Sequence, residues 1–210
     1  MIRIWIGGSA RSPFRIAQLA QRLAQKGIRP ASITAQAVYL VDAEAWAPSD
    51  EARLAALVGC PLAPLEAISA DARLVIPRFG TVSPWSSKAT EILRLCGLAC
   101  VRRIEHGVLW RFSGLSAEAV DQAARLAMDR MTETFVRSPE EAERLFDAPP
   151  PRALAHVPVI EEGRVALERA NREMGLALSA EEINYLFDWF MRARRNPTDA
   201  ELMMFAQANS

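Results

Sequence analysis

The feature that most constrains the fold of this chain is an internal repeat with a period of about 70 residues. A Ser-Pro-aromatic triplet occurs at residues 12–14 and again at 83–85, and each triplet begins a helical pattern that ends at a glycine, Gly27 or Gly97. Serine before proline is typical of a helix N-terminus, because the serine hydroxyl caps a free amide and proline needs no amide partner there. A glycine just past the last turn is typical of a helix C-terminus. The two segments are therefore expected to be equivalent helices.

The strands flanking these helices repeat as well. Residues 2–6 alternate apolar and other side chains and precede the first helix, and residues 73–77 hold the same place before the second. Further strands are expected at 33–41 and 101–112, the latter with a bulge at Gly107.

Each repeat then ends in a second helix, begun by Ser49 or Ser116, and a last strand is expected near residues 133–137. One repeat alone leaves its sheet and helices half covered, so the two repeats are expected to pair. The sequence predicts an α+β fold: a duplicated strand–helix, pseudo-dimeric domain with an antiparallel sheet, covering residues 1–147.

The remaining residues, 148–210, have a different character. Pro149-Pro150-Pro151 cannot continue a helix and predicts a stiff linker. Only helices are expected beyond it, at about 161–174, 180–194 and from 199 onward, with capping boxes at the starts of the last two. We therefore predict a small all-helical linker domain.

Composition excludes several classes of partner. The chain has 25 basic and 25 acidic residues without a basic run, so a nucleic-acid partner is not expected. No apolar stretch approaches the length of a membrane helix, which predicts a protein without membrane contact in the cytoplasm. Its 3 cysteines are an odd number and lack metal-ligand spacing, so neither a disulfide framework nor a metal site is expected.

The candidate site residues lie in the window PRFGTVSPWSSKATEI, residues 77–92. Arg78, Ser86, Ser87 and Lys88 surround the start of the second helix, where free amides and the helix dipole favour an anion. One interpretation is a binding site for a phosphate or an acidic partner surface. The other is a helix cap whose hydroxyls satisfy the helix's own free amides. Lys88 opposes the dipole, which favours a partner for it, and the pattern of a nucleotide P-loop is absent.

Several stretches resemble one family along the whole chain. They are the window at 77–92, GVLWRF at 107–112, DRMTETF at 129–135, MGLALSAEEINYL at 174–186 and RNPTDAELMMFAQANS at 195–210. The family is the large, single-chain phosphoribosylformylglycinamidine synthase, also called formylglycinamide ribonucleotide amidotransferase, of de novo purine biosynthesis. The resemblance implies an N-terminal portion of that enzyme. Residues 1 to about 145 resemble a domain that mimics a dimer of the small separate subunit of split forms, in agreement with the repeat. The rest resembles a helical linker domain.

The resemblance also implies a function. The complete enzyme is a glutamine- and Mg-ATP-dependent ligase that converts formylglycinamide ribonucleotide to its amidine, and its synthetase and glutaminase domains are the expected partners. No residue of the 210 is expected to be catalytic or to bind a cofactor or metal, so the segment alone is expected to be an inactive structural and coupling part. The alternative is a free-standing small-ligand regulatory module of ACT type, for which Gly7-Gly8-Ser9 offers a weak ligand loop. The tail at 195–210 has no place in such a module.

Overall fold

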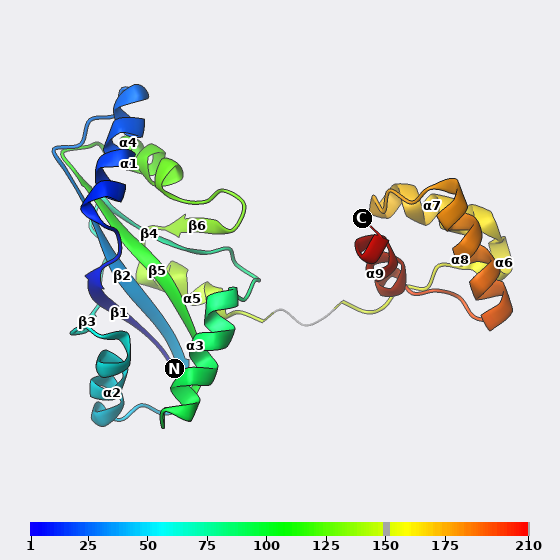
Figure 1. Ribbon diagram of the computed structural model, residues 1–210, viewed down its shortest axis with the longest axis horizontal. Helices are drawn as coiled ribbons and strands as arrows, with labels where there is room; N and C mark the ends of the chain where they lie inside the picture. Colours follow the sequence, from blue (N-terminus) through cyan, green and yellow to red (C-terminus); the bar gives the residue numbers. More distant parts are fainter. Residues whose placement is uncertain (149–151, 210) are drawn as a thin grey trace. The chain divides into compact units, whose positions relative to one another are not determined.

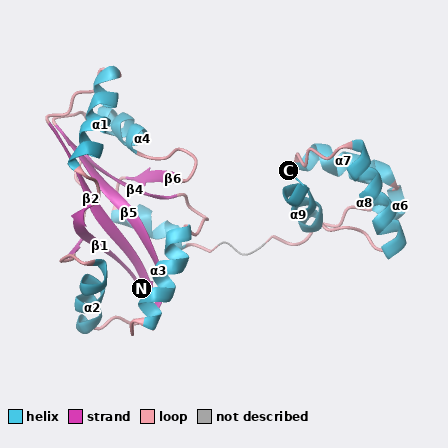
Figure 2. Ribbon diagram, in the orientation of Figure 1, coloured by secondary structure: helices cyan, strands magenta, loops and turns pink. Residues whose placement is uncertain are grey.

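A computed structural model describes residues 1–148 and 152–209, so the predicted Pro149-Pro150-Pro151 linker lies outside the described residues. The chain divides into two compact units, Met1–Pro149 and Pro150–Ser210 (Figure 1). The first unit contains all the strands of the described residues, and the second is helical (Figure 2). The predicted α+β class, followed by a helical region, is confirmed.

A six-stranded antiparallel sheet forms the first unit, in the order β3-β1-β2-β5-β4-β6. The two repeats thus contribute three neighbouring strands each, joined by a long central pairing of β2 with β5 that runs from Ser32↔Ser113 to Asp42↔Arg103 before a register shift. Equivalent elements take equivalent places on either side of that pairing, as the duplication predicts. The strands are β1 (Ile2–Ser9), β2 (Ser32–Ala43), β3 (Ala63–Pro64), β4 (Ala72–Pro77), β5 (Val101–Ser113) and β6 (Glu133–Val136).

The helices that follow the strands cover one face of the sheet in two pairs. At one end, α1 and α4 bury Leu19 and Val120 against Trp110 of β5. At the other end, α2 and α3 bury Leu54 and Leu93 (Figure 1). The bounds of these helices are α1 Pro13–Gln25, α2 Pro48–Val58, α3 Pro84–Leu95 and α4 Ala117–Ala127.

The opposite face of the sheet carries a third core cluster. Leu40 and Leu74 point to this side because side chains alternate along a strand. A short helix α5 (Pro139–Glu143) and a 3₁₀ turn η1 (Arg144–Phe146) close over it with Leu145, which is fully buried. After β6, the chain therefore passes over the face of the sheet that α1–α4 leave uncovered, before it leaves the first unit.

Two local expectations for the first unit were wrong. Pairing continues through Gly107 without a bulge, and the register shift lies at Asp42/Ala43 instead. A Cβ at Gly107 would lie 2.8 Å from the backbone oxygen of Val75, so close strand packing explains this glycine. Helix α2 begins at Pro48, with Ala47 as its N-cap, because the Asp50 carboxylate accepts from the Ala47 amide.

In the second unit, four helices bury one apolar cluster, which includes Leu167, Leu186 and Leu202. The helix expected at 161–174 is two helices, because Gly163, at φ +70°, separates them. The capping box predicted at Ser179 is confirmed. The bounds are α6 Val159–Glu162, α7 Arg164–Met174, α8 Ala180–Ala193 and α9 Asp199–Asn209.

Candidate functional site at the start of helix α3

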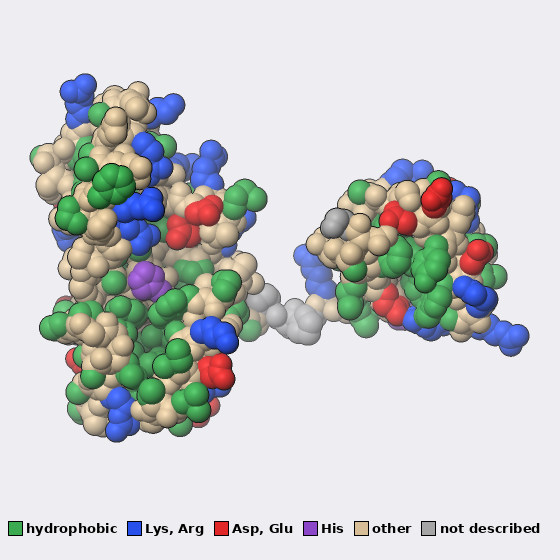
Figure 3. Space-filling view, viewed as in Figure 1, with side chains coloured by type: hydrophobic (Ala, Val, Ile, Leu, Met, Phe, Trp, Pro, Cys, Tyr) green, Lys and Arg blue, Asp and Glu red, His purple; other side chains and the backbone are tan. Residues whose placement is uncertain are grey.

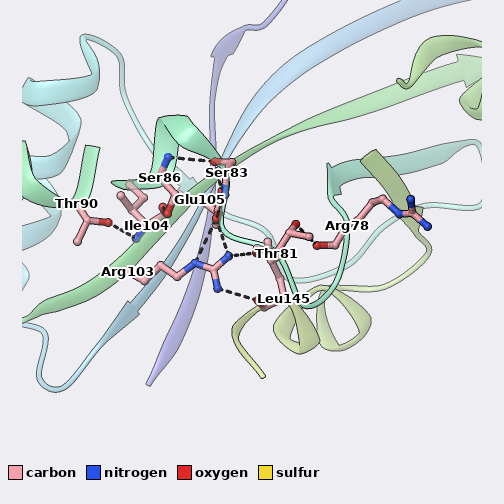
Figure 4. Close-up of polar contacts among 9 residues, drawn as sticks. All are labelled: Arg78, Thr81, Ser83, Ser86, Thr90, Arg103, Ile104, Glu105 and Leu145. Carbon is pink, nitrogen blue, oxygen red and sulfur yellow. Dashed lines mark hydrogen bonds and ion pairs between the residues drawn. The ribbon is translucent and has the colours of Figure 1, made fainter. Parts of the chain in front are cut away.

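The crowded hydroxyls of the 77–92 window compensate for a strand that ends early. β4 pairs with β5 only as far as Val75↔Val108, which leaves the backbone of Ile104 without a strand on that side. Helix α3 fills the gap: Ser86 Oγ donates to the Ile104 oxygen at 2.6 Å, and the Ile104 amide donates to Thr90 Oγ1 at 3.1 Å (Figure 4). Both side chains are buried. Two of the hydroxyls therefore take the place of ladder hydrogen bonds.

A buried carboxylate holds the start of the same helix. Glu105 is completely buried, and it accepts from the Ser83 amide at 3.1 Å and from Ser83 Oγ at 2.7 Å. Ser83 in turn caps α3 by accepting from the Ser86 amide at 3.0 Å. A carboxylate taken out of water is strongly unfavourable unless it is paired and hydrogen-bonded, so Glu105 needs a counter-charge.

Arg103 supplies that charge and extends the network. Its Nη2 lies 2.6 Å from Oε1 of Glu105 and 2.7 Å from the Thr81 oxygen, and its Nη1 donates to the Leu145 oxygen at 3.1 Å. The guanidinium also lies over the ring of Phe146, 5.3 Å from its centroid. Three segments, the loop before α3, strand β5 and turn η1, are thereby held at one point (Figure 4).

The four predicted site residues do not converge. Ser86 faces inward to Ile104 and is buried. Ser87 and Lys88 are exposed, and their side chains have no hydrogen-bond or ion-pair partner within residues 1–148 and 152–209. Arg78 is exposed and donates from Nη1 to the Met131 oxygen at 3.3 Å. That Arg78, Ser87 and Lys88 contact a partner or a phosphate stays a prediction.

A cavity of about 510 Å³ lies beside the loop at residues 78–83 that connects β4 to α3, which we call the cavity loop. The ring of His106 lies between Tyr39 and Trp85, with a centroid separation of 5.6 Å to each. Burial lowers the pKa of His106, and the positive charge of Arg11 lowers it further, whereas the charge of Glu105 raises it. The lining comprises Pro77, Arg78, Thr81, Val82, Ser83, Pro84, Trp85, His106, Met131, Thr132 and Glu133.

The face around the histidine of the first unit has a charged side and an apolar side. Figure 3 shows basic and acidic side chains mainly on one side of this histidine and the larger group of hydrophobic side chains on the other. Strand alternation from Ile104 and Val108 places His106 on this face, but only the fold brings Tyr39 and Trp85 to it. The arrangement provides apolar surface, hydrogen-bonding groups and cations. These features suit binding.

Within residues 1–148 and 152–209, no group of three or more His, Cys, Asp or Glu side chains is placed to hold a metal ion. Across the same residues, none of the helices has both the length and the apolar character needed to span a membrane.

Comparison with protein families assigns both units. The family model described as the N-terminal domain of formylglycinamide ribonucleotide amidotransferase matches residues 36–146, which include β5, α3 and the cavity loop. The model described as the linker domain of the same enzyme matches residues 167–210. The matches cover more than half of the chain, in the order the resemblance implies, and the ACT-type alternative has no support. The chain therefore belongs to the formylglycinamide ribonucleotide amidotransferase family, of which it carries the N-terminal and linker domains.

Proposed function

We propose that this chain is a structural and coupling segment of the amidotransferase, and that it carries out no chemistry of its own. In the complete enzyme, ATP activates the amide oxygen of formylglycinamide ribonucleotide, and ammonia from glutamine displaces the phosphate. Mg-ATP belongs to the complete enzyme in this proposal, and the segment binds no cofactor. Its partners are the synthetase and glutaminase domains, and its expected cytoplasmic location stays a prediction.

An exposed apolar stripe on α3 is the observation that carries this proposal. Trp85, Ile92 and Leu95 are 42%, 54% and 81% exposed. With Lys88 they follow the spacing i, i+3, i+7, i+10, so all four share one face of the helix. Single exposed apolar residues are ordinary, but a row of them along one helix is typical of a surface that another domain covers.

The position of Lys88 within the stripe favours a partner surface that carries a negative charge. A lysine among apolar side chains gains most from a partner that offers a carboxylate or phosphate at that point, since an unpaired charge at a covered surface is costly. The Glu105 network supports the same proposal, because it fixes the start of α3 and hence the direction of the stripe. The inward hydroxyls hold the helix, and the outward side chains remain for a partner.

The test is Lys88→Ala in the complete enzyme, with synthesis measured from glutamine and, separately, from added ammonia. If the stripe couples the catalytic domains, the glutamine-dependent rate falls about tenfold or more while the ammonia-dependent rate holds, because loss of one partner of a covered charge pair is worth about 2 kcal/mol or more. Lys26→Ala changes the chain's other lysine and serves as the matched control.

Two results would contradict the coupling role. An equal loss of both rates points to substrate binding at Lys88. No loss in either rate leaves α3 as a helix whose cap is its only role. The melting curve of each variant is recorded beside the rates, because a change of stability alone lowers both rates together.

A further inference from the structure

A second cavity, which we call the arginine cavity, lies along helix α1. Its volume is about 450 Å³. Three arginines, Arg11, Arg15 and Arg22, line it, and no acidic side chain does. The remaining lining is Gln18, Leu19, Trp110 and Ala127.

None of these arginines takes part in an ion pair with another described residue. Arg11 Nη1 donates to the Ala10 oxygen at 2.9 Å, and Arg15 Nη1 lies 3.4 Å from Gln18 Oε1. By contrast, Arg73 in the same unit binds the carboxylate of Asp121 at 2.6 Å. The cavity thus gathers positive charge that the fold leaves without a counter-charge among residues 1–148 and 152–209.

The sequence of α1 concentrates that charge against local preference. Arg15 lies in the first turn, where the helix dipole disfavours a cation, and the helix contains no acidic residue. The equivalent position of the second repeat, also three residues after the capping serine, is Ser86, which binds the backbone of β5. Local structure therefore explains Ser86 but does not explain Arg15.

Contacts at the inner end of the cavity keep Arg11 in place. Its guanidinium lies 6.0 Å from the ring centroid of Trp110, which is buried. The same charge contributes, after burial, to the lowered pKa of His106. The guanidinium of Arg11 therefore lies against Trp110 of strand β5 instead of extending into the solvent.

We infer that the arginine cavity binds a small ligand that carries two or more linked phosphate groups. Guanidinium groups bind phosphate oxygens in pairs, which makes arginine the preferred side chain for this chemistry. Arg15 and Arg22 are two turns apart, about 10 Å along the helix, so one phosphate cannot engage both fully, whereas a phosphate chain approaches both. The concave shape, with Leu19 and Trp110 as its wall, favours a compact ligand over an extended acidic peptide.

Isothermal titration of this 210-residue chain with sodium tripolyphosphate tests the inference, at constant ionic strength. We expect saturable binding with one ligand per chain. Arg15→Ala and Arg22→Ala each weaken it about tenfold, the effect of losing one hydrogen-bonded charge contact. Arg15→Lys keeps the charge but loses the paired geometry, so its loss is intermediate. Arg172→Ala removes an exposed arginine of the second unit and should leave the affinity unchanged.

Three outcomes overturn the inference. One is the absence of saturable binding by a chain with an unaltered melting curve. Another is an equal loss in Arg172→Ala, which indicates unspecific attraction. The third is tighter binding of a poly-glutamate peptide, abolished by Arg15→Ala, which assigns the cavity to an acidic protein segment. Because Lys88 does not line the cavity, none of these results depends on the coupling role proposed above.

Discussion

Replacing Glu105 by glutamine tests whether the buried network holds the start of α3. The carboxylate is completely buried and accepts from the Ser83 amide, Ser83 Oγ and Arg103. Glutamine keeps the shape of the side chain, but its amide NH₂ group replaces one accepting oxygen and then faces the donors of Ser83 or Arg103. The substitution also leaves Arg103 without its counter-charge. Breaking a buried pair costs about 3–5 kcal/mol; we expect about 3 kcal/mol, since Arg103 keeps the oxygens of Thr81 and Leu145.

For a unit of this size, that loss lowers the melting temperature by about 6–12 °C. Thermal and urea unfolding of the 210-residue chain, followed by tryptophan fluorescence, measure it. Arg102→Ala breaks the Arg102–Asp42 pair, whose arginine is 51% exposed, and it should cost much less. A Glu105→Gln shift no larger than that of Arg102→Ala would refute the reasoning. In the double variant Glu105→Gln/Arg103→Met, we expect part of the stability to return, because the unpaired charge is gone.

Two further substitutions test the centre of the sheet. Burial and the charge of Arg11 lower the pKa of His106, so the folded state disfavours its protonation. The contribution of His106 to the free energy of unfolding is therefore complete above about pH 6.5 and is lost as the pH falls below that value. In His106→Gln the melting temperature should depend less on pH between 7 and 5 than in the control His156→Gln, and an unchanged dependence contradicts this. Gly107→Ala places a methyl group 2.8 Å from the Val75 oxygen and should lower the free energy of unfolding, measured in urea, by about 1–3 kcal/mol. Gly8→Ala is the control, because the nearest contact of its methyl group is at 3.6 Å, and it should cost less. Equal losses in the two variants contradict the explanation by close packing.

Local signals account for what the sequence predicts well. Ser12 and Ser83 cap their helices with their own side chains, so a short stretch of sequence suffices to place both helix starts. The duplication then predicts that the two halves pair, because one half alone leaves its sheet and helices half covered. The order of the strands in the sheet was not predicted and comes from the structure. Gly163 shows the limit of such signals, since the apolar pattern continues across it while the backbone turns there.

The candidate site depended on information that a local pattern does not carry. Ser86 and Thr90 meet Ile104 only because the pairing of β4 with β5 ends at Val75, two residues before β4 itself ends at Pro77. The crowded hydroxyls are evident in the sequence, but the sequence does not show which of them face inward. Glu105 was visible only as a charged residue in an apolar strand, which is the signal that could have revealed the network.

The two repeats satisfy the hydrogen-bonding groups of their strand backbones in different ways. That difference leaves the side chains of α1 available for binding. In the first repeat the backbone of Ala10 donates to the Ala35 oxygen, so the main chain satisfies the strand. In the second, Ser86 and Thr90 do so. Because the first repeat needs no hydroxyl from its helix, Arg15 occupies the position equivalent to Ser86.

A symmetric pair of identical subunits presents the same surface twice, since every substitution appears in both copies. Joining two copies in one chain removes that constraint. Here α1 contributes the arginine cavity, while α3 contributes an apolar stripe interrupted by Lys88. The fused domain can therefore offer two chemically different surfaces on one symmetric sheet. If both proposals hold, the variants at Arg15 and at Lys88 affect different properties, phosphate-chain affinity in one case and glutamine-driven synthesis in the other.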